Sequence, residues 1–354
     1  MANLVHDLLA FPADGSKGAH RFLLGLDDAS PDTHAEYQRL CASEFANGQD
    51  SALVAGAFQR TVNVNHAAFA VDTPAVLTAV TIVTPTLFAD LRVPTSRPAS
   101  IAARGSLGEC SEAELKELAQ TVSFAGFAVV EYGLPGYDGF PVCERLTCID
   151  SQPPPRRYPN QWRIETNWPK GGWIEWGARK DFHGQALYFE HWKRLPKGEG
   201  GPHLALRRSK SEGQDALLLV VDDHFILLDD RPTGPLATVN PGEGGHPSDR
   251  GALAVLAQRA SSAEELRQLN SYCSVYGSVS AGWRISLASW PWLEGTPLLG
   301  AAGRLKSIEI DPVKNTAIIM EEGGARQWDL LENTFTAEGL ADMLGAVSAG
   351  RAAL

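Results

Sequence analysis

The sequence has no hydrophobic run long enough to cross a lipid bilayer. Its longest apolar stretches, VLTAVTIV and DALLLVV, are shorter than ten residues, whereas a spanning helix needs about 20 consecutive apolar residues. The first segment, MANLVHDLLAFPADGSKG, lacks the basic residues that precede the apolar part of a secretory signal. We therefore expect a cytoplasmic protein that does not associate with a membrane.

Cysteine is scarce as well. The chain has 354 residues and only five cysteines, an odd and widely spaced set that does not predict a disulfide framework. Cys143 and Cys148 are five residues apart in a predicted strand, so they point to opposite faces and are poorly placed to share a metal ion. We expect buried structural thiols in a reducing compartment. The full set is Cys41, Cys110, Cys143, Cys148 and Cys273.

The motifs of many common enzyme classes are absent. No G-x-G-x-x-G follows a predicted strand and no Walker loop is present, so the phosphate cradles of dinucleotide- and nucleotide-dependent enzymes are missing. G-x-S-x-G, S-x-x-K and H-E-x-x-H are missing too. The nine histidines are scattered singly, so a metal site would need ligands from distant strands. Because 42 acidic residues outnumber 31 basic ones, nucleic acid is not expected as a partner.

Short β-prone segments separated by turn-forming residues make up most of the chain. It contains 34 glycines and 22 prolines, and the segments between them are rich in β-branched and aromatic residues, which is typical of many short strands. Helices do not alternate with strands, which argues against a doubly wound parallel sheet. The predicted strands span residues 20–25, 52–58, 60–71, 75–83, 86–93, 125–132, 142–150, 161–166, 172–178, 185–194, 203–208, 215–222, 224–229, 282–289, 304–310, 315–322 and 326–331.

A few amphipathic helices complete the prediction. One spans residues 30–46, and another follows Thr336. Two more begin at the capping boxes 111–114 and 261–264, where a serine precedes a glutamate by three residues. The second of these is expected to run to Cys273. Each helix has one apolar stripe, which predicts that it packs on a sheet.

These patterns predict a mainly β protein with a minor α+β part. We expect an antiparallel barrel of about eight to ten strands, with a ligand cavity, over residues 74–230. Residues 1–73 and 251–354 are expected to form together a second unit that is rich in strands and partly helical. The glycine- and proline-rich segment 231–250 is long enough to be a linker or a lid.

Residues 151–210 differ in composition from the rest of the chain. They hold 12 basic and 5 acidic residues and five of the nine tryptophans. Aromatic rings among cations suit an aromatic or anionic ligand. The alternative is that the tryptophans fill a barrel and the basic side chains are solvated at its rim.

Strand 185–194 carries the strongest candidates for chemistry. Its alternation places Tyr188, Glu190 and Trp192 on one face and His191 on the other, apolar face. The first face is amphipathic, so a barrel with a wet cavity would turn it inward. Glu190 is then a candidate acid or base, with Tyr188 and His191 assisting it.

Strand 172–178 supplies a second carboxylate. Trp173 and Glu175 share one face, and Trp176 lies on the other. Apolar surroundings disfavour the charged form of a carboxyl group, so Glu175 is also a candidate acid or base with a raised pKa. A glutamate on an exposed strand face would look the same in the sequence.

Strand 86–93 carries a pair of opposite charges. Asp90 and Arg92 share one face, opposite an apolar face. They are able to orient a polar or anionic ligand group, while Trp173, Trp176 and Trp192 would wall the cavity. A structural ion pair at the mouth of a barrel is the alternative.

At TLFADLRVPTSRP, CIDSQPP and YFEHWKR the sequence resembles a group of uncharacterised bacterial proteins with a lipocalin-like β-barrel character. The resemblance covers about residues 76–331 and implies a lipocalin-like barrel. At the level of the fold it is also similar to two-barrel lipocalin-like enzymes, among them Diels–Alderases and carotenoid hydratases. Those proteins use an apolar cavity with a few polar groups to fold or protonate a hydrophobic substrate, and the analogy extends to no particular residue here.

The sequence favours three functions in turn. The first is a cofactor-free lyase, isomerase or cyclase that acts on a small hydrophobic or aromatic molecule, with Glu190 or Glu175 moving the proton. The second is a non-catalytic carrier or sensor of such a ligand. The third is a haem or metal protein that uses His191 or His183. The sequence leaves open whether the chain forms a homodimer.

Overall fold

The structure is a computed structural model, and several stretches of it are described. Three predicted segments lie outside the described residues: the strand 20–25, the helix 30–46 and nearly all of the linker or lid 231–250. The described residues are 54–65, 70–131, 141–152, 160–166, 172–177, 188–208, 214–232 and 252–349.

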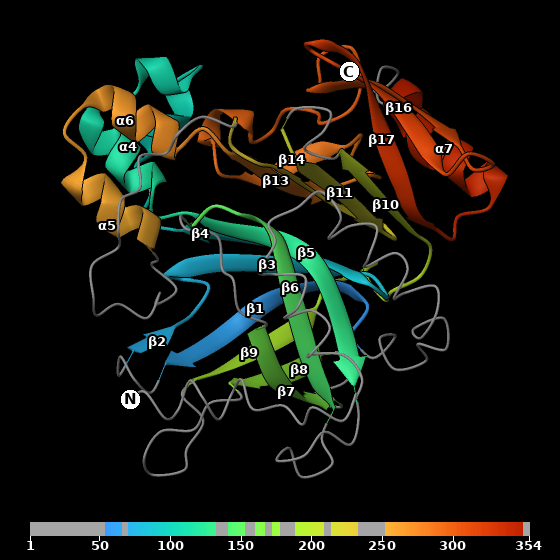
Figure 1. Cartoon of the computed structure of the whole chain (residues 1–354), viewed down its shortest axis with the longest axis horizontal. Coiled ribbons are helices and arrows are strands. Elements are labelled where there is room, and N and C mark those ends of the chain that lie inside the picture. Colours follow the sequence, from blue (N-terminus) through green and yellow to red (C-terminus); the bar gives the residue numbers. More distant parts are fainter. Residues whose placement is uncertain are drawn as a thin grey trace, which may run out of the picture.

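Within these stretches, nine antiparallel strands form the first sheet. They are β1 (Gly56–Asn65), β2 (Ala70–Asp72), β3 (Leu77–Val83), β4 (Leu87–Pro94), β5 (Val122–Glu131), β6 (Val142–Asp150), β7 (Asn160–Thr166), β8 (Gly172–Gly177) and β9 (Tyr188–Arg194). Their order is β2-β1-β3-β4-β5-β6-β7-β8-β9, and β9 also pairs with β1. The sheet therefore closes on itself as a barrel (Figure 1).

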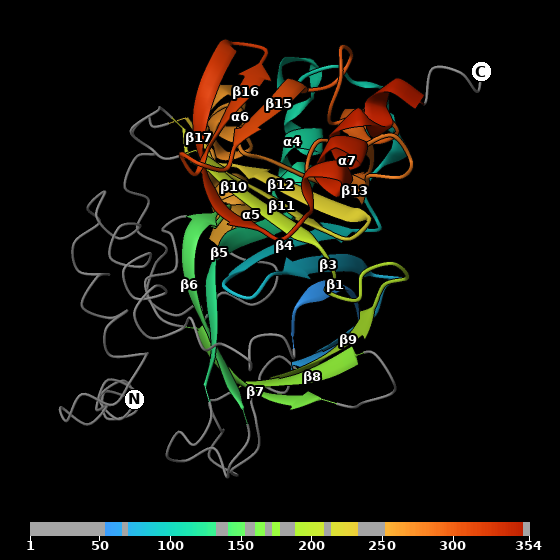
Figure 2. The same cartoon turned by 90° about the vertical axis from the view of Figure 1, so that its right-hand side faces the viewer.

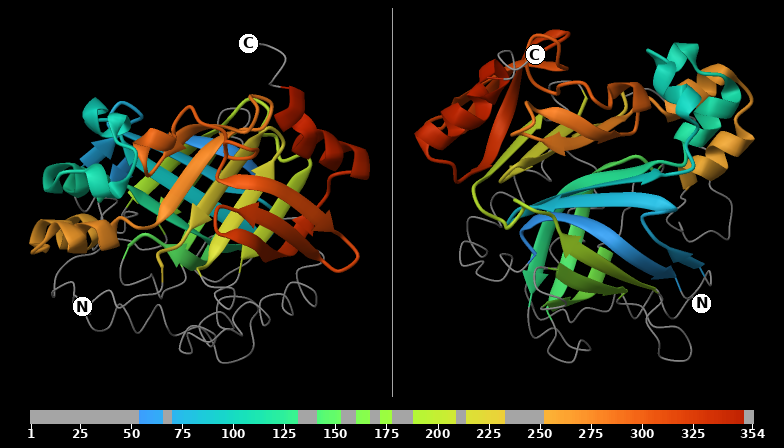
Figure 3. Two further views of the ribbon diagram at one scale, coloured as in Figure 1. Left: turned by 90° about the horizontal axis from the view of Figure 1, so that it is seen from above. Right: turned by 180° about the vertical axis from the view of Figure 1, so that it is seen from behind.

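Eight further antiparallel strands form a second sheet. They are β10 (His203–Arg208), β11 (Ala216–Val221), β12 (His224–Asp229), β13 (Cys273–Ser278), β14 (Arg284–Ala288), β15 (Leu305–Asp311), β16 (Thr316–Glu321) and β17 (Gly324–Asn333). Their order is β14-β13-β12-β11-β10-β17-β16-β15. This sheet lies over the barrel and curls away from it (Figures 1 and 3). The predicted mainly β, antiparallel class is confirmed.

The division of the chain between the two sheets differs from the predicted boundaries. Strand β1 precedes residue 74 and yet belongs to the barrel, whereas β10, β11 and β12 precede residue 230 and belong to the second sheet. The reason is that β1 is needed to close the barrel between β3 and β9. Pairing of strands far apart in sequence leaves no trace in a local residue pattern.

The apolar outer face of the barrel packs on the second sheet. In β4, Leu87, Ala89, Leu91 and Val93 point outward and belong to this shared core, as their alternation predicts. Residues of β10, β11, β12 and β13 face them from the other side. Figure 2 shows β10, β11 and β12 lying directly above β3 and β4. This apolar core holds the second sheet against the barrel.

Two of the predicted helix starts are confirmed. Helix α4 (Glu112–Leu118) begins at Ser111, whose hydroxyl accepts the amide of Glu114 in a complete capping box. Helix α7 (Ala337–Ala349) begins after Thr336, and it lies against the outer side of the second sheet (Figure 2).

A third predicted helix was placed one residue too early and extended too far. Helix α6 (Ala263–Leu269) is capped by Ser262, whose hydroxyl accepts the amide of Glu265. Its end is fixed because the side chain of Asn270 donates to backbone carbonyls. Cys273, expected on this helix, begins strand β13. The β-branched and aromatic residues after it favour a strand.

The described helices form two groups at opposite ends of the molecule. Helices α4 and α6 pack with α5 (Ala252–Arg259) around an apolar cluster of their own. Helix α7 lies at the far end of the second sheet (Figure 3). Short 3-10 helices complete the described structure: η3 (Ala99–Ala103), η4 (Leu107–Glu109) and η6 (Pro291–Leu293).

Replacement of Leu219 by alanine tests the core between the sheets. Leu219 is fully buried in β11, so Leu219→Ala should lower the free energy of unfolding by about 2–5 kcal/mol through lost burial and a residual cavity. Ile318→Ala is the control because Ile318 is 41% exposed. Urea unfolding measures both, and equal losses would show that the shared core does not hold the sheets together.

Candidate functional site

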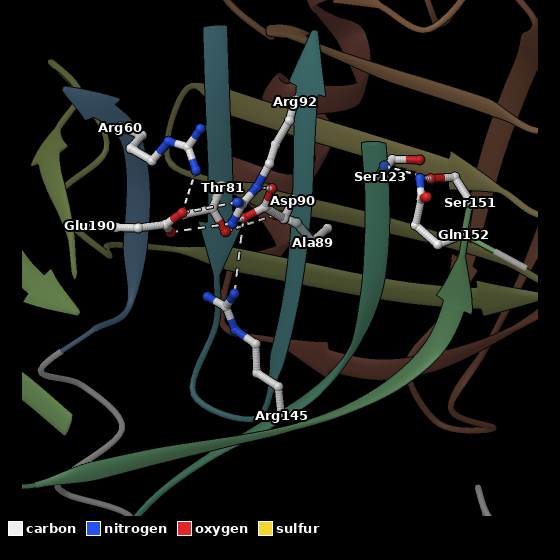
Figure 4. Close-up of polar contacts among 10 residues, drawn as sticks. All are labelled: Arg60, Thr81, Ala89, Asp90, Arg92, Ser123, Arg145, Ser151, Gln152 and Glu190. Atoms are coloured by element: carbon white, nitrogen blue, oxygen red, sulfur yellow. Dashed lines mark hydrogen bonds and ion pairs between the residues drawn. The ribbon is translucent and has the colours of Figure 1, made fainter. Parts of the chain in front are cut away.

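The inward face of the barrel combines large aromatic rings with buried charges. Phe58, Phe88, Phe124, Trp162, Trp173 and Trp192 all belong to one buried cluster inside the barrel. Between them lie Arg60, Asp90, Arg92, Arg145 and Glu190, which we call the inner charge cluster (Figure 4). Each of the five is at most 5% exposed. Because a buried charge is costly unless it is paired, these side chains must be arranged around one another.

Arg92 is the centre of the inner charge cluster. Its Nε donates to Asp90 Oδ1 at 2.8 Å, and its Nη1 donates to Glu190 Oε1 at 2.9 Å. Arg60 donates to the same Glu190 oxygen. The predicted face-sharing pair Asp90–Arg92 is therefore formed, and Glu190 serves as an acceptor for two guanidinium groups. Such charge-assisted bonds are about twice as strong as neutral ones.

Arg145 is held mainly by aromatic rings. Its guanidinium carbon is 4.3 Å from the ring centres of both Phe88 and Trp162. Its closest carboxylate among the described residues is Asp90, with a separation of 3.9 Å between Nη1 and Oδ2. Its Nε is buried and has no hydrogen-bond partner within the described part of the chain. Arg145 therefore brings more hydrogen-bond donors into the barrel than these residues accept.

Three indole groups add to this surplus of donors. The Nε1 atoms of Trp162, Trp173 and Trp192 are buried, and none has an acceptor among the residues that are described. Trp173 and Trp192 stack with ring centres 5.5 Å apart, and the edge of Phe58 meets Trp173. Buried Trp N–H groups usually find a partner. The inside of the barrel is thus rich in donors whose acceptors the described residues do not provide.

Glu175 lies next to Glu190 on the neighbouring strand. The two residues are directly paired between β8 and β9, and their exposures are 3% and 2%. The alternation that predicted Trp173 and Glu175 on one face thus brings both carboxylates to the buried face. Tyr188 and Trp176 lie in β9 and β8, but the described structure does not include their side chains.

His191 points away from the inner charge cluster, to the other face of β9. Its Nδ1 is 2.6 Å from the hydroxyl of Thr61, and burial lowers its pKa. His191 therefore does not contact Glu190, which it was expected to assist. His183, the other histidine named for a metal or haem, lies outside the described residues.

Within the described residues, no group of three or more His, Cys, Asp or Glu side chains is arranged to hold a metal ion. The same residues include no helix that is both long and apolar enough to pass through a membrane.

Cys143 lies inside the barrel and Cys148 packs on its outer core, so the expected opposite orientation of the two thiols is confirmed.

Two members of the inner charge cluster, Arg60 and Arg145, were not identified as site residues from the sequence. Arg145 shares its strand face with Cys143, so its inward position follows from the same alternation once β6 is known to line the barrel. Arg60 shares its strand face with Phe58, but a bulge between Arg60 and Val62 breaks the alternation of β1 on the other side.

Comparisons with known proteins add a structural likeness. No protein-family model and no curated protein matches the sequence. Among solved structures, the crystal structure of the uncharacterized protein YLR301w from Saccharomyces cerevisiae is similar, with a TM-score of 0.44 and 11% sequence identity. The match covers 79% of this chain and 99% of that protein. At this level of similarity it carries no argument about family or function.

Removal of one carboxylate tests whether the inner charge cluster holds the barrel together. Glu190→Ala leaves Arg60 and Arg92 buried without this partner, so the free energy of unfolding should fall by about 3–5 kcal/mol. The control, Glu309→Ala, removes an exposed glutamate of β15 and should change it by about 0.5 kcal/mol or less. Urea unfolding distinguishes the two, and a loss for Glu190→Ala as small as the control's would contradict the assignment.

The lowered pKa of His191 predicts how acid affects stability. Between its unfolded value of 6.5 and its lower folded value, the unfolded chain binds more protons, so stability falls as the pH decreases through this window. His191→Gln removes this contribution. Urea unfolding at pH 7.5 and pH 5.5 should therefore show a smaller acid-induced loss for the variant, and an unchanged or larger loss would refute the prediction.

Proposed function

We propose that the inside of the barrel binds one small aromatic molecule that carries a hydrogen-bond acceptor, such as a carboxylate. The observation that supports this function is the surplus of buried donors. Arg145 Nε and the indole N–H groups of Trp162, Trp173 and Trp192 lack acceptors among the described residues. A ligand with oxygen acceptors would supply them, and aromatic walls favour a flat ring.

Arg145 is the residue that would hold the anionic end of the ligand. Asp90 and Glu190 already accept short bonds from Arg92, and Arg145 approaches Asp90 only to 3.9 Å, so Arg145 is the less fully neutralised of the two arginines. An arginine that stacks on rings keeps its planar N–H groups available for a carboxylate. The function is that of a carrier or sensor, and it corresponds to the use that lipocalin-like barrels make of their interior.

Acid–base conversion of the bound molecule is a second candidate function. It is favoured because two buried carboxylates, Glu175 on β8 and Glu190 on β9, are directly opposite each other on neighbouring strands. Because Glu190 Oε1 accepts N–H groups from both Arg60 and Arg92, proton transfer is assigned to Glu175. Protonation of Glu190 would first break charge-assisted bonds worth about 1.5–3 kcal/mol each.

Binding of aromatic carboxylates tests the proposed function. Tryptophan fluorescence of the purified protein is titrated with benzoate, salicylate and indole-3-acetate, because the site contains stacked tryptophans. Arg145→Met should weaken binding about tenfold or more, since a charged hydrogen bond is lost. Arg259→Met, at an exposed position at the end of α5, should leave affinity unchanged. No binding by any probe, or equal binding by Arg145→Met, would contradict the proposal.

Conversion is checked on the same complexes. Mass spectrometry of the bound probe after incubation shows whether its covalent structure changes. If Glu175 moves a proton, Glu175→Gln should retain binding and lose conversion by about 10²–10⁴-fold. An unchanged probe in the wild-type protein would leave the carrier or sensor function alone.

A further inference from the structure

The second sheet contains a pocket of its own on the face that points away from the barrel. It has a volume of about 110 Å³ and is lined by residues of β10, β11, β12, β15, β16 and β17. We call it the second-sheet pocket. Its charged and aromatic lining consists of Arg208, Asp229, Arg304, Glu321, Glu322 and Trp328.

One wall of this pocket is a fixed ion-pair network. Arg208 donates from Nη2 to Asp229 Oδ1 at 2.5 Å and from Nε to the carbonyl of Gln214 at 2.6 Å. It also donates to Glu321, whose other oxygen accepts the indole N–H of Trp328 at 3.0 Å. Arg208 lies over the Trp328 ring at 5.4 Å. These side chains are fully engaged with one another and form a rigid wall.

Arg304 has capacity left for a ligand. Among the described residues it makes a single hydrogen bond, from Nη2 to Asp229 Oδ2 at 3.1 Å. Its side chain is 29% exposed and lies over the Trp290 ring. Stacking fixes the guanidinium plane and leaves its remaining N–H groups free to bind a carboxylate.

Glu322 offers the opposite charge at the edge of the same pocket. It is exposed, and it forms no ion pair with any described residue. It nevertheless lines the same pocket as Arg304. The pocket therefore presents a cation and an anion that are near each other and not bonded directly.

We propose that the second-sheet pocket binds a small free α-amino acid. The ligand carboxylate would bind Arg304, and its ammonium group would bind Glu322. Three carboxylates and two guanidinium groups line the pocket, so a simple anion meets net negative charge, whereas a zwitterion satisfies both free groups. A volume of about 110 Å³ is several times the space that a single water molecule needs, so the pocket has room for a small amino acid.

Ligand titration with matched variants tests this proposal. Glycine, alanine and serine are titrated by calorimetry up to about 20 mM, with acetate and methylammonium as probes of each charge alone. We expect at least one amino acid to bind and both single-charge probes to bind at least about tenfold more weakly. Arg304→Gln and Glu322→Gln should each weaken binding about tenfold or more, while Arg326→Gln, an exposed position on β17, should not.

Two further variants keep the result interpretable. Ala216 is buried at the pocket wall, so Ala216→Leu should fill the space and abolish binding while charges stay in place. Arg145→Met, inside the barrel, should leave amino-acid binding intact, which separates this site from the barrel. The proposal is overturned if no amino acid binds, if acetate binds equally well, or if folded Arg304→Gln binds like the wild type.

Discussion

The barrel depends on Arg92, a buried cation with two anions. Its guanidinium joins Asp90 on its own strand to Glu190 on β9, with β1 and β3 lying between the two strands. Because an unpaired charge inside a protein costs several kcal/mol, β4 and β9 must both turn these residues inward. A slip of either strand by one residue would move the charge to the opposite face and break the cluster.

That constraint determines the outer surface as well. When Asp90 and Arg92 point inward, the residues that alternate with them on β4 must point outward; these are Leu87, Ala89, Leu91 and Val93. The outward face is then continuously apolar, and the second sheet covers it. The second sheet repeats the same chemistry on the face that points away from the barrel, where Arg208 lies over Trp328 and bonds to Asp229. In both sheets, arginine is stabilised by a ring and a carboxylate together.

The sequence predicts the local part of this arrangement well. Alternation alone places Glu190 with Trp192, and Asp90 with Arg92, on faces that the structure shows to be buried. A local residue pattern does not identify the partner with which a strand pairs. Strands β1 and β9, for example, pair although about 130 residues of chain separate them. The assignment of β1 to the barrel, and of Arg60 to its interior, therefore needed the three-dimensional pairing. The bulge after Arg60 also breaks the alternation between this residue and the second half of β1.

The same pairing separates the roles of the buried charges. Glu190 looks like a catalytic base in the sequence, but an oxygen that accepts N–H groups from two arginines has its lone pairs engaged. The sequence does not identify Arg145 as a site residue. In the structure its guanidinium lies over the rings of Phe88 and Trp162, and its closest carboxylate among the described residues, Asp90, is 3.9 Å away. Donors in a buried site without acceptors favour a ligand that brings acceptors with it. Binding is therefore the function that we propose first, with proton transfer second, because this geometry supplies donors for a ligand and engages the lone pairs of Glu190 Oε1.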